Sequence, residues 1–342
     1  MSRSKSPTII DVAREAGVSK SAVSRALLGQ GDVSPETVER VRAVADRLGY
    51  VPNAMARGLV SQRTQTLGVV LRDATNPFYG HLHAAMQQRA AQLGYKVVAV
   101  TGVEELTPED ARAALRSLIA LRVDGLIVCS AQLPGEDLAQ YVDRLPIMAA
   151  GRAEYAEGVV SVHCDEQDGG ARLAEYLLRL GHRDVAVLLV QESESASQHA
   201  RGRSMIDTLR EHGASVRVIE MDSYRRLAGS VVMAALENPA ITALMCPTDL
   251  VMAKVLEELR IRDIPVPSQL SVTGYDAIGY LAEPLLGFTS FRQPIEQIGT
   301  TAVDRIIEMI SEEGPSEQRT AIKGTLVPGR TTAPPRATPT FR

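Results

Sequence analysis

The segment of residues 20–28 (KSAVSRALL) brings together side chains that could read a nucleic acid. At about 100° per residue, a helix over this segment would gather its lysine, serine and arginine side chains on one face. Alanine, valine and leucine side chains would occupy the opposite face. Hydrogen-bond donors beside cations are what a helix needs to contact base edges and phosphates in the major groove of DNA. An amphipathic surface helix would show the same separation, so the neighbouring elements must decide between the two.

A second group of polar residues follows short apolar runs farther along the chain. Its members are Asp73, Ser130, Arg152, Asp165, Thr248 with Asp249, and Tyr275 with Asp276. Each of them alone could be a capping or turn residue. Together they end successive runs, and parallel α/β sheets bind ligands beyond the carboxyl ends of their strands. Carboxylates with an arginine can hydrogen-bond several hydroxyls at once, which favours a sugar or polyol over an apolar ligand.

The sequence contains no GxxxxGK[ST], HExxH or GxSxG motif, the signatures of phosphate-loop, zinc and serine-nucleophile chemistry. His81 and His83 lie in a predicted helix, where residues two apart point about 200° away from each other. His163, Cys164 and Asp165 are neighbours on a predicted strand, and adjacent strand residues face opposite sides. We therefore expect no enzyme activity, no cofactor and no metal.

Three predicted helices would position the 20–28 segment. Thr8 can cap a first helix that Gly17 ends, and Ser19 can cap the second helix two residues later. Such a tight turn between two short helices predicts a helix-turn-helix motif. A third helix would begin after Ser34, with proline at its first position. We therefore expect a small all-α DNA-binding domain over residues 1–52.

The charge of the chain is divided unevenly. The whole chain of 342 residues carries a formal charge of −4. Residues 1–63 nevertheless contain ten Lys and Arg against six Asp and Glu, and the remainder contains 27 against 35. A basic head on an acidic body favours a polyanion as the partner of the head.

Residues 53–66 are predicted to form a hinge helix and linker. Asn53 can cap a short helix to about residue 60, but Gly58 weakens it, and one or two turns are marginal alone. We expect this helix to form only when something packs against it. The polar stretch SQRTQT then leads into the body.

The body, residues 67–332, alternates short apolar strands with helices in two similar halves. That alternation predicts two doubly wound, parallel-sheet subdomains. We place the N-subdomain at about 67–163 and 294–321, and the C-subdomain at about 164–293 and 322–332. A helix over 294–312 should cover the first sheet, and a last strand at about 322–328 should join the second subdomain. The proline-rich tail, 333–342, is predicted to be disordered.

The composition is that of a globular protein. Apolar residues make up 45% and charged residues 23%, and no run reaches the ~18 apolar residues of a membrane span. The first ten residues lack the apolar segment of a signal peptide, and three scattered cysteines make no disulfide framework. We expect a cytoplasmic, nucleoid-associated protein.

Long motifs resemble a known family. PTIIDVAREAGVSKSAVSRAL and VSPETVERVRAVADRLGYVPNAMARGL resemble the headpiece of the LacI/GalR (lactose and galactose repressor) family of transcription factors. LGVVLRDATNPFYG, RVDGLIV, LGHRDVAVL, SVTGYDA and TSFRQP resemble its periplasmic-binding-protein-like body. The resemblance implies a dimeric regulator, a repressor, that binds near-palindromic operator DNA and whose operator affinity changes when a small polar effector (a sugar, polyol or nucleoside-like molecule) closes the cleft of the body.

The resemblance also implies roles for residues of the head. Paired hinge helices of the family meet in the minor groove, where a leucine wedges open the central base step; Leu59 stands at that position here. The residues that would face the major groove are Lys20, Ser21, Ala22, Ser24 and Arg25. We also assign Thr8, Asn53 and Arg57 to the DNA interface.

In the body, the resemblance and the strand-end pattern together place ten residues at the effector. They are Asp73, Asn76, Phe78, Ser130, Arg152, His199, Tyr224, Thr248, Asp276 and Gln293. Three pocket positions depart from the family: His199 stands where an arginine is common, Thr248 where an asparagine is common, and Gly151 where an aspartate is frequent. The effector of a relative therefore does not transfer to this chain.

Alternatives to the simple repressor stay open at the level of sequence. No leucine heptad follows the body, so we expect a dimer rather than a tetramer. A regulator of carbon metabolism that needs a corepressor or a phosphocarrier partner is one alternative. A sugar-binding sensor whose head does not read DNA is a more remote one.

Overall fold

The computed structural model describes residues 7–28, 33–51, 63–102, 106–221, 229–311 and 317–335. They fall into two compact units, Met1–Thr64 and Gln65–Arg342, called the head and the body below. The segment expected to form the hinge helix, residues 53–60, and residues 336–342 of the expected disordered tail, 333–342, lie outside the described residues; Ala333 is ordered and hydrogen-bonds to Ser271. Among the described residues, no helix is both long and apolar enough to cross a lipid bilayer.

The head is a bundle of three helices whose ends follow local signals. The helices are α1 (Ile9–Ala16), α2 (Lys20–Leu28) and α3 (Pro35–Leu48). Gly17, with φ of 67°, ends α1 in the left-handed conformation that glycine adopts without strain. The Ser19 hydroxyl then accepts a hydrogen bond from the Ala22 N–H at 3.1 Å and starts α2. This is the predicted helix-turn-helix.

The three helices of the head share one apolar core. Val12 of α1, Val23 of α2 and Val41 of α3 are fully buried in it. Each valine belongs to the apolar stripe of its helix, so burial of the three stripes fixes which face of α2 remains outside.

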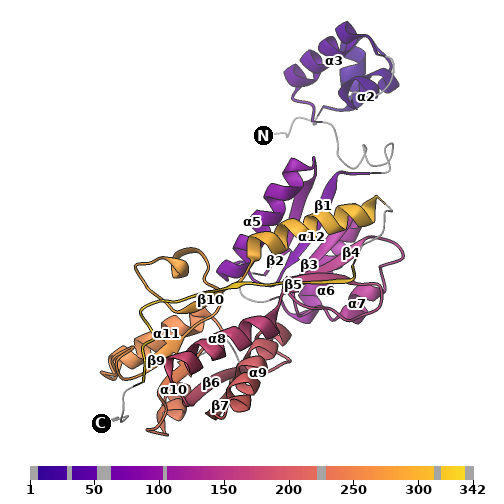
Figure 1. Ribbon diagram of the computed structural model, residues 1–342. Helices are drawn as coiled ribbons and strands as arrows, with labels where there is room; N and C mark the ends of the chain where they lie inside the picture. The colour runs from indigo at the N-terminus through magenta and orange to yellow at the C-terminus, as the bar shows by residue number, and fades with distance from the viewer. Residues whose placement is uncertain are drawn as a thin grey trace. The chain divides into compact units, whose positions relative to one another are not determined.

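The first sheet of the body is parallel and six-stranded, in the order β11-β5-β4-β3-β1-β2. Its strands are β1 (Thr66–Leu71), β2 (Lys96–Thr101), β3 (Gly125–Cys129), β4 (Ile147–Ala150), β5 (Val160–Cys164) and β11 (Arg319–Ile322). Its helices are α5 (Pro77–Gln92), α6 (Pro108–Ala120), α7 (Gly135–Ala139) and α12 (Ile295–Ile310) (Figure 1).

Helices cover both faces of this sheet. Successive residues of a buried strand point in opposite directions, so the side chains of one strand pack on both faces. Leu67, Val69 and Leu71 of β1 belong to the cluster that includes α5 and α12 residues. Val70 belongs to the cluster that includes α6 residues. The near-continuous apolar sequence of β1 is therefore what a strand buried on both sides requires.

The second sheet of the body has four parallel strands in the order β7-β6-β8-β9. They are β6 (Asp184–Val190), β7 (Ser215–Met221), β8 (Ala243–Met245) and β9 (Ser271–Thr273). The helices of this half are α8 (Glu166–Leu180), α9 (Ala196–Glu211), α10 (Gly229–Leu236) and α11 (Asp249–Ile261), with a short 3-10 helix η1 (Gly279–Ala282) after β9.

The C-terminal residues form two strands. The strand expected at about 322–328 is short, and a separate strand precedes it at the end of the segment expected to return to the first subdomain. β11 joins the first sheet beside β5, and β12 (Thr325–Val327) pairs antiparallel with β10 (Ser290–Arg292). β12 thus belongs to neither parallel sheet. Pairing between strands more than 30 residues apart leaves no signal in sequences as short as RTAI and TLV.

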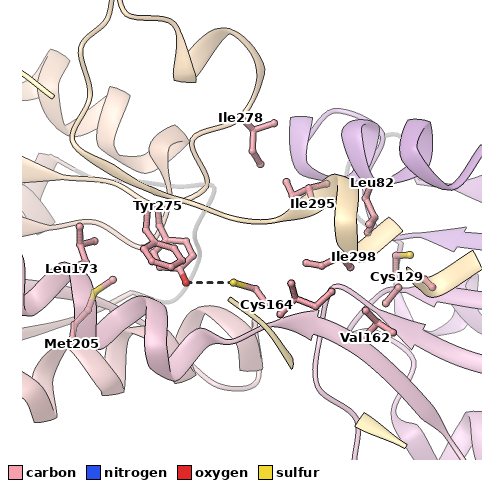
Figure 2. Packing of buried hydrophobic residues seen from close by; sticks show 14 of the residues in the cluster. Leu82, Cys129, Val162, Cys164, Leu173, Met205, Tyr275, Ile278, Ile295 and Ile298 are labelled. Carbon is pink, nitrogen blue, oxygen red and sulfur yellow. Dashed lines mark hydrogen bonds between the residues drawn. The ribbon is translucent and has the colours of Figure 1, made fainter. Parts of the chain in front are cut away.

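A single apolar cluster runs through both halves of the body. It includes Leu82 and Ile298 from helices of the first half, and Leu173 and Met205 from helices of the second (Figure 2). Where the halves meet, Tyr275 is fully buried and stacks on Phe291, with ring centroids 5.0 Å apart. Its hydroxyl lies 3.8 Å from Cys164 Sγ, the contact drawn in Figure 2. The halves are therefore joined by packed side chains as well as by the chain itself.

Candidate functional site

The outer face of α2 carries the charged and polar side chains of the helix. Lys20, Ser21 and Arg25 are exposed, while Ser24 and Ala22 are half-buried. Arg25 donates from Nε to the backbone oxygen of Ser21 at 3.4 Å, which keeps the guanidinium along its own helix. The separation of faces expected from the sequence is present. A donor-rich surface on a helix held from behind by a small core can enter a major groove.

The other head residues assigned from the sequence have different positions. Thr8 is exposed before α1, and both its N–H and its hydroxyl donate to the Asp11 carboxylate, at 2.9 and 2.7 Å. Asn53, Arg57 and Leu59 lie outside the described residues.

The body contains a cavity at the carboxyl ends of β1, β3 and β4, closed on its other side by residues that follow the strands of the second sheet. About 590 Å³ in and around it, open solvent included, is not occupied by protein atoms. Seven of the ten effector residues expected from the sequence line it: Asn76, Phe78, Ser130, Arg152, Thr248, Asp276 and Gln293. Four of the seven, Ser130, Arg152, Thr248 and Asp276, were expected from strand ends, and the other three from the resemblance.

Three helices begin at this cavity. The N-cap side chains of α5, α9 and α11 are Asn76, Ser195 and Thr248, and all three line it. Each side-chain oxygen accepts a hydrogen bond from a backbone N–H in the first turn of its helix, at 3.0, 3.4 and 3.2 Å respectively. The amino ends of helices carry partial positive charge, so the three helices together favour negative charge in the cavity.

Two residues assigned to the effector are occupied elsewhere. Asp73 is buried, and its Oδ1 accepts hydrogen bonds from the N–H and the hydroxyl of Thr75, both at 2.8 Å. The ring nitrogen Nδ1 of His199 lies 2.9 Å from the backbone oxygen of Val190. Neither is among the residues that line the cavity. Tyr224 lies outside the described residues.

The remaining polar residues from strand ends hold the backbone together. Asp165 caps α8 by accepting from the Asp168 N–H at 3.0 Å. Asp249 is fully buried and accepts from Ser290 Oγ and the Ala277 N–H, both at 2.7 Å. Burial raises the pKa of Asp249 to about 8. These two carboxylates stabilise the segments that form the walls of the cleft.

Sequence reasoning missed Arg72 and Arg201, both of which line the cavity. Arg72 directly follows β1, and its Nη1 donates at 2.8 Å to the backbone oxygen of Glu194, just ahead of α9. The signal for it was present, since an arginine ends the apolar run LGVVL. Arg201 lies two residues after His199 on α9, where no strand end marks it in the sequence.

Arg201 is the centre of a buried charge network. It is 3% exposed and makes two hydrogen bonds to Glu166, both at 2.8 Å. Its Nη1 lies 3.3 Å from Asp276 Oδ1, and its guanidinium carbon lies 3.9 Å from the centre of the Tyr275 ring. Gln293 Nε2 also donates to Asp276 Oδ1, at 2.7 Å. Burial raises the pKa of Asp276 to about 6, against the opposing effects of Arg201 and Gln293.

Arg152 is held at the opposite wall. Its Nη1 pairs with Glu154, and its Nη2 donates to the Leu133 backbone oxygen at 2.8 Å. Among the described residues, no group of three or more His, Cys, Asp and Glu side chains is placed to hold a metal ion. The chemistry of the cavity is thus multiple hydrogen bonding by arginines, amides, hydroxyls and one lining carboxylate.

Family models match both parts of the chain. Residues 8–53 match a model described as bacterial regulatory proteins of the lacI family. Residues 64–331 match a model described as periplasmic binding proteins and the sugar binding domain of the LacI family.

Similar proteins extend over nearly the whole chain. The ribose operon repressor of Halalkalibacterium halodurans is 30% identical, over 95% of this chain and 97% of its own. Catabolite control protein A of Priestia megaterium is 29% identical, over 90% and 93%. Among solved structures, a lac repressor dimer bound to operator and the anti-inducer ONPF is 25% identical, with a TM-score of 0.84 over 96% of this chain and 100% of that one. A complex of the regulator CelR with cellobiose is 26% identical, with a TM-score of 0.66 over 95% and 99%.

Proposed function

The chain belongs to the LacI family of bacterial regulatory proteins, and from this membership we propose how its sites work together. It is a DNA-binding regulator of transcription and not an enzyme. We propose that it represses transcription as a homodimer on a near-palindromic operator, and that it works in the cytoplasm, on the nucleoid.

In this proposal, residues 1–52 bind DNA, residues 53–66 form the hinge and residues 67–332 bind the effector. Each α2 would lie in the major groove of one operator half, with Lys20, Ser21, Ala22, Ser24 and Arg25 toward the bases. Thr8 at the start of α1 would contact the phosphate backbone of the DNA, because the amino ends of helices favour phosphate groups. The relative solved on its operator is a dimer, which supports two-fold binding here.

The hinge would complete the complex in the minor groove. Two hinge segments, each with Asn53, Arg57 and Leu59, would fold against each other on bent DNA. Wedging a leucine into a base step costs a few kcal/mol of unstacking, which contacts on the bent duplex offset. This coupling makes operator binding sensitive to anything that changes the body.

The cavity of the body would hold the effector. The observation that carries the proposal is the convergence of seven expected residues on one cavity in a chain that also has the helix-turn-helix head. Relatives named as ribose and sucrose operon repressors, and the CelR–cellobiose complex, support a sugar-like molecule. The effector shifts operator affinity only as far as its own affinity differs between the two states of the body.

Selection of genomic DNA fragments by the purified full-length protein tests the proposal. Near physiological salt, with and without a small-molecule cell extract, we expect enrichment of a near-palindrome of roughly 14–20 base pairs. Binding to it should fall steeply with salt, with a log–log slope of about −0.9 per phosphate contacted. If no sequence is enriched under either condition, the head does not read DNA and the proposal is wrong.

A further inference from the structure

The charged side chains that line the cavity are mostly arginines. Arg72, Arg152 and Arg201 line it, and Asp276 is the one carboxylate among its described lining residues. Asp276 Oδ1 is already engaged by Arg201 and Gln293. The sequence had suggested several carboxylates that would bind hydroxyls, and the structure instead presents guanidinium groups.

The other acidic residues near these arginines are turned toward protein partners. Glu154 pairs with Arg152 and accepts from the backbone N–H groups of Tyr155 and Ala156, at 2.8 and 3.0 Å. Glu166 is buried and makes its two hydrogen bonds to Arg201. These carboxylates hold the guanidinium groups in fixed positions and are not among the residues that line the cavity.

Two of the arginines come from the same edge of the first sheet. Arg72 follows β1 and Arg152 follows β4, with Ser130 after β3 between them. Two strand spacings separate the β1 and β4 backbones by roughly 10 Å. Two long arginine side chains at that spacing, with a hydroxyl between them, can hold a planar or tetrahedral anionic group, which guanidinium donors bind in pairs.

Two buried atoms of lining residues add a constraint on the ligand. Arg152 Nε and Gln198 Oε1 have no hydrogen-bond partner among the described residues. A buried donor and a buried acceptor each cost stability until something binds them. A molecule that carries both acceptor oxygens and hydroxyl donors would engage both.

We infer that the effector is a hydroxylated anion, with a phosphate or carboxylate group seated between Arg72 and Arg152 and its hydroxyls toward Gln198 and Asp276. This inference rests on the proposed effector site and narrows its ligand to sugar phosphates or sugar acids. The amino ends of α5, α9 and α11 at the cavity add to the same preference.

Anion binding to the full-length protein tests the inference directly. The probes are inorganic phosphate and acetate, each compared with chloride at equal ionic strength, and the readout is the midpoint of thermal unfolding. We expect phosphate or acetate to raise the midpoint of the native protein and to have a much smaller effect on Arg72→Gln. Arg179→Gln, on the exposed surface of α8, is the control and should respond like the native protein. Equal responses of Arg72→Gln and the native protein would overturn the inference.

Titration with matched sugars then distinguishes a phosphate from a carboxylate as the anionic group of the ligand. Calorimetric titration compares glucose, glucose 6-phosphate and gluconate on the native protein and on Arg72→Gln. Loss of one charge-assisted contact should weaken binding of the anionic sugar about tenfold or more. A preference for the phosphate identifies sugar phosphates as the class, and a preference for gluconate identifies sugar acids. Tighter binding of glucose than of either anion would contradict the inference.

The selection of genomic DNA fragments distinguishes failure of this inference from failure of the proposed regulatory function, on which the inference rests. If an operator is selected but only neutral sugars change its binding, the regulator stands and the anionic effector is wrong. If anions bind the cavity but no DNA sequence is selected, the cavity assignment stands and the regulatory function is wrong.

Discussion

At Arg201 one guanidinium holds together the wall of the cavity in the body. It joins the first residue of α8, Glu166, to Asp276 after β9, and it lies on the Tyr275 ring. Removing one member of a buried charge pair leaves the other uncompensated, which costs about 3–5 kcal/mol. The network therefore serves the fold and the cavity together, and substitutions in it are poor tests of ligand binding alone.

Arg25→Ala tests direct reading of bases by α2. If the guanidinium contacts a base in bidentate fashion, the variant should lose about 1–3 kcal/mol of binding free energy and tolerate any base at one operator position. Binding of a set of singly substituted operators measures this. Arg179→Ala, on the exposed side of α8, serves as the control. An equal loss on every sequence would reassign Arg25 to a phosphate.

Asp249→Asn tests the cost of the buried carboxyl beside the cleft. Burial raises the pKa of Asp249 from 3.8 to about 8. A carboxyl with a raised folded-state pKa contributes stability below its unfolded pKa, and this contribution is lost as pH rises through the folded pKa. The native protein should therefore lose stability relative to Asp249→Asn between about pH 4 and pH 8, by up to several kcal/mol.

Urea unfolding at several pH values across that range measures the Asp249 effect. The exposed carboxyl of Asp207 on α9 provides the matched variant, Asp207→Asn, which should follow the native pH dependence. If the free energy of unfolding of Asp249→Asn and of the native protein changes with pH in the same way, the pKa of Asp249 is not raised by its burial.

At the scale of elements, the position of α8 depends on small residues where the two halves of the body meet. Gly169 lies against Tyr275 and Phe291, and a Cβ added there would overlap the Tyr275 hydroxyl. Glycine in a helix costs about 1 kcal/mol relative to alanine, so its use here must be compensated by packing. Close approach of α8 lets the aromatic stack fill the junction between the halves.

A pair of glycine substitutions tests this account. Gly169→Ala should lower the free energy of unfolding by about 1–3 kcal/mol, because the core has no room for the methyl group. Gly80→Ala, inside α5 with no atom within 4 Å of the added Cβ, should raise it by about 0.5–1 kcal/mol. Denaturant unfolding of the two variants measures both changes. Stabilisation by Gly169→Ala would mean that α8 can move away from the aromatic pair.

At the scale of the whole molecule, regulation requires the body to influence how the head meets DNA. The head and the body are separate compact units that divide between Thr64 and Gln65, within the stretch 53–66 that we propose as hinge and linker. A segment that folds only on bent operator DNA can carry such coupling, because its ordering is part of the binding equilibrium. The body can then act on DNA affinity without touching the bases.

Leu59→Ala tests that coupling. The variant should bind the selected operator much more weakly than the native protein does and should bind unrelated DNA almost as well, since only the bent, specific complex uses the wedge. Gel-shift titrations on both DNAs at one salt concentration measure the two affinities. Equal losses on operator and unrelated DNA would remove the wedge from the mechanism.

Much of this architecture follows from the sequence because its signals are local. Thr8, Gly17, Ser19 and Ser34 delimit the helices of the head by capping and turn chemistry within a few residues. Apolar runs such as LGVVL predict the parallel strands for the same reason. A strand that is buried on both faces is apolar whichever strands it pairs with. Ser130, Arg152, Thr248 and Asp276 were expected at the cavity they line because strand ends of a parallel sheet share one edge, whereas Asn76, Phe78 and Gln293 were expected only from the resemblance to the family.

The tertiary structure alone decided which polar groups remain for a ligand. The sequence places Arg72 and Asp73 directly after a strand and Arg201 within a helix, but it does not show what each one contacts. Asp73 is engaged by Thr75 two residues away, whereas Arg201 meets partners 35 and 75 residues away. Hydrogen-bond satisfaction of a buried group depends on atoms that the fold brings together, and local sequence does not contain them. For that reason the change from a carboxylate-lined cleft to an arginine-lined one emerged only in three dimensions.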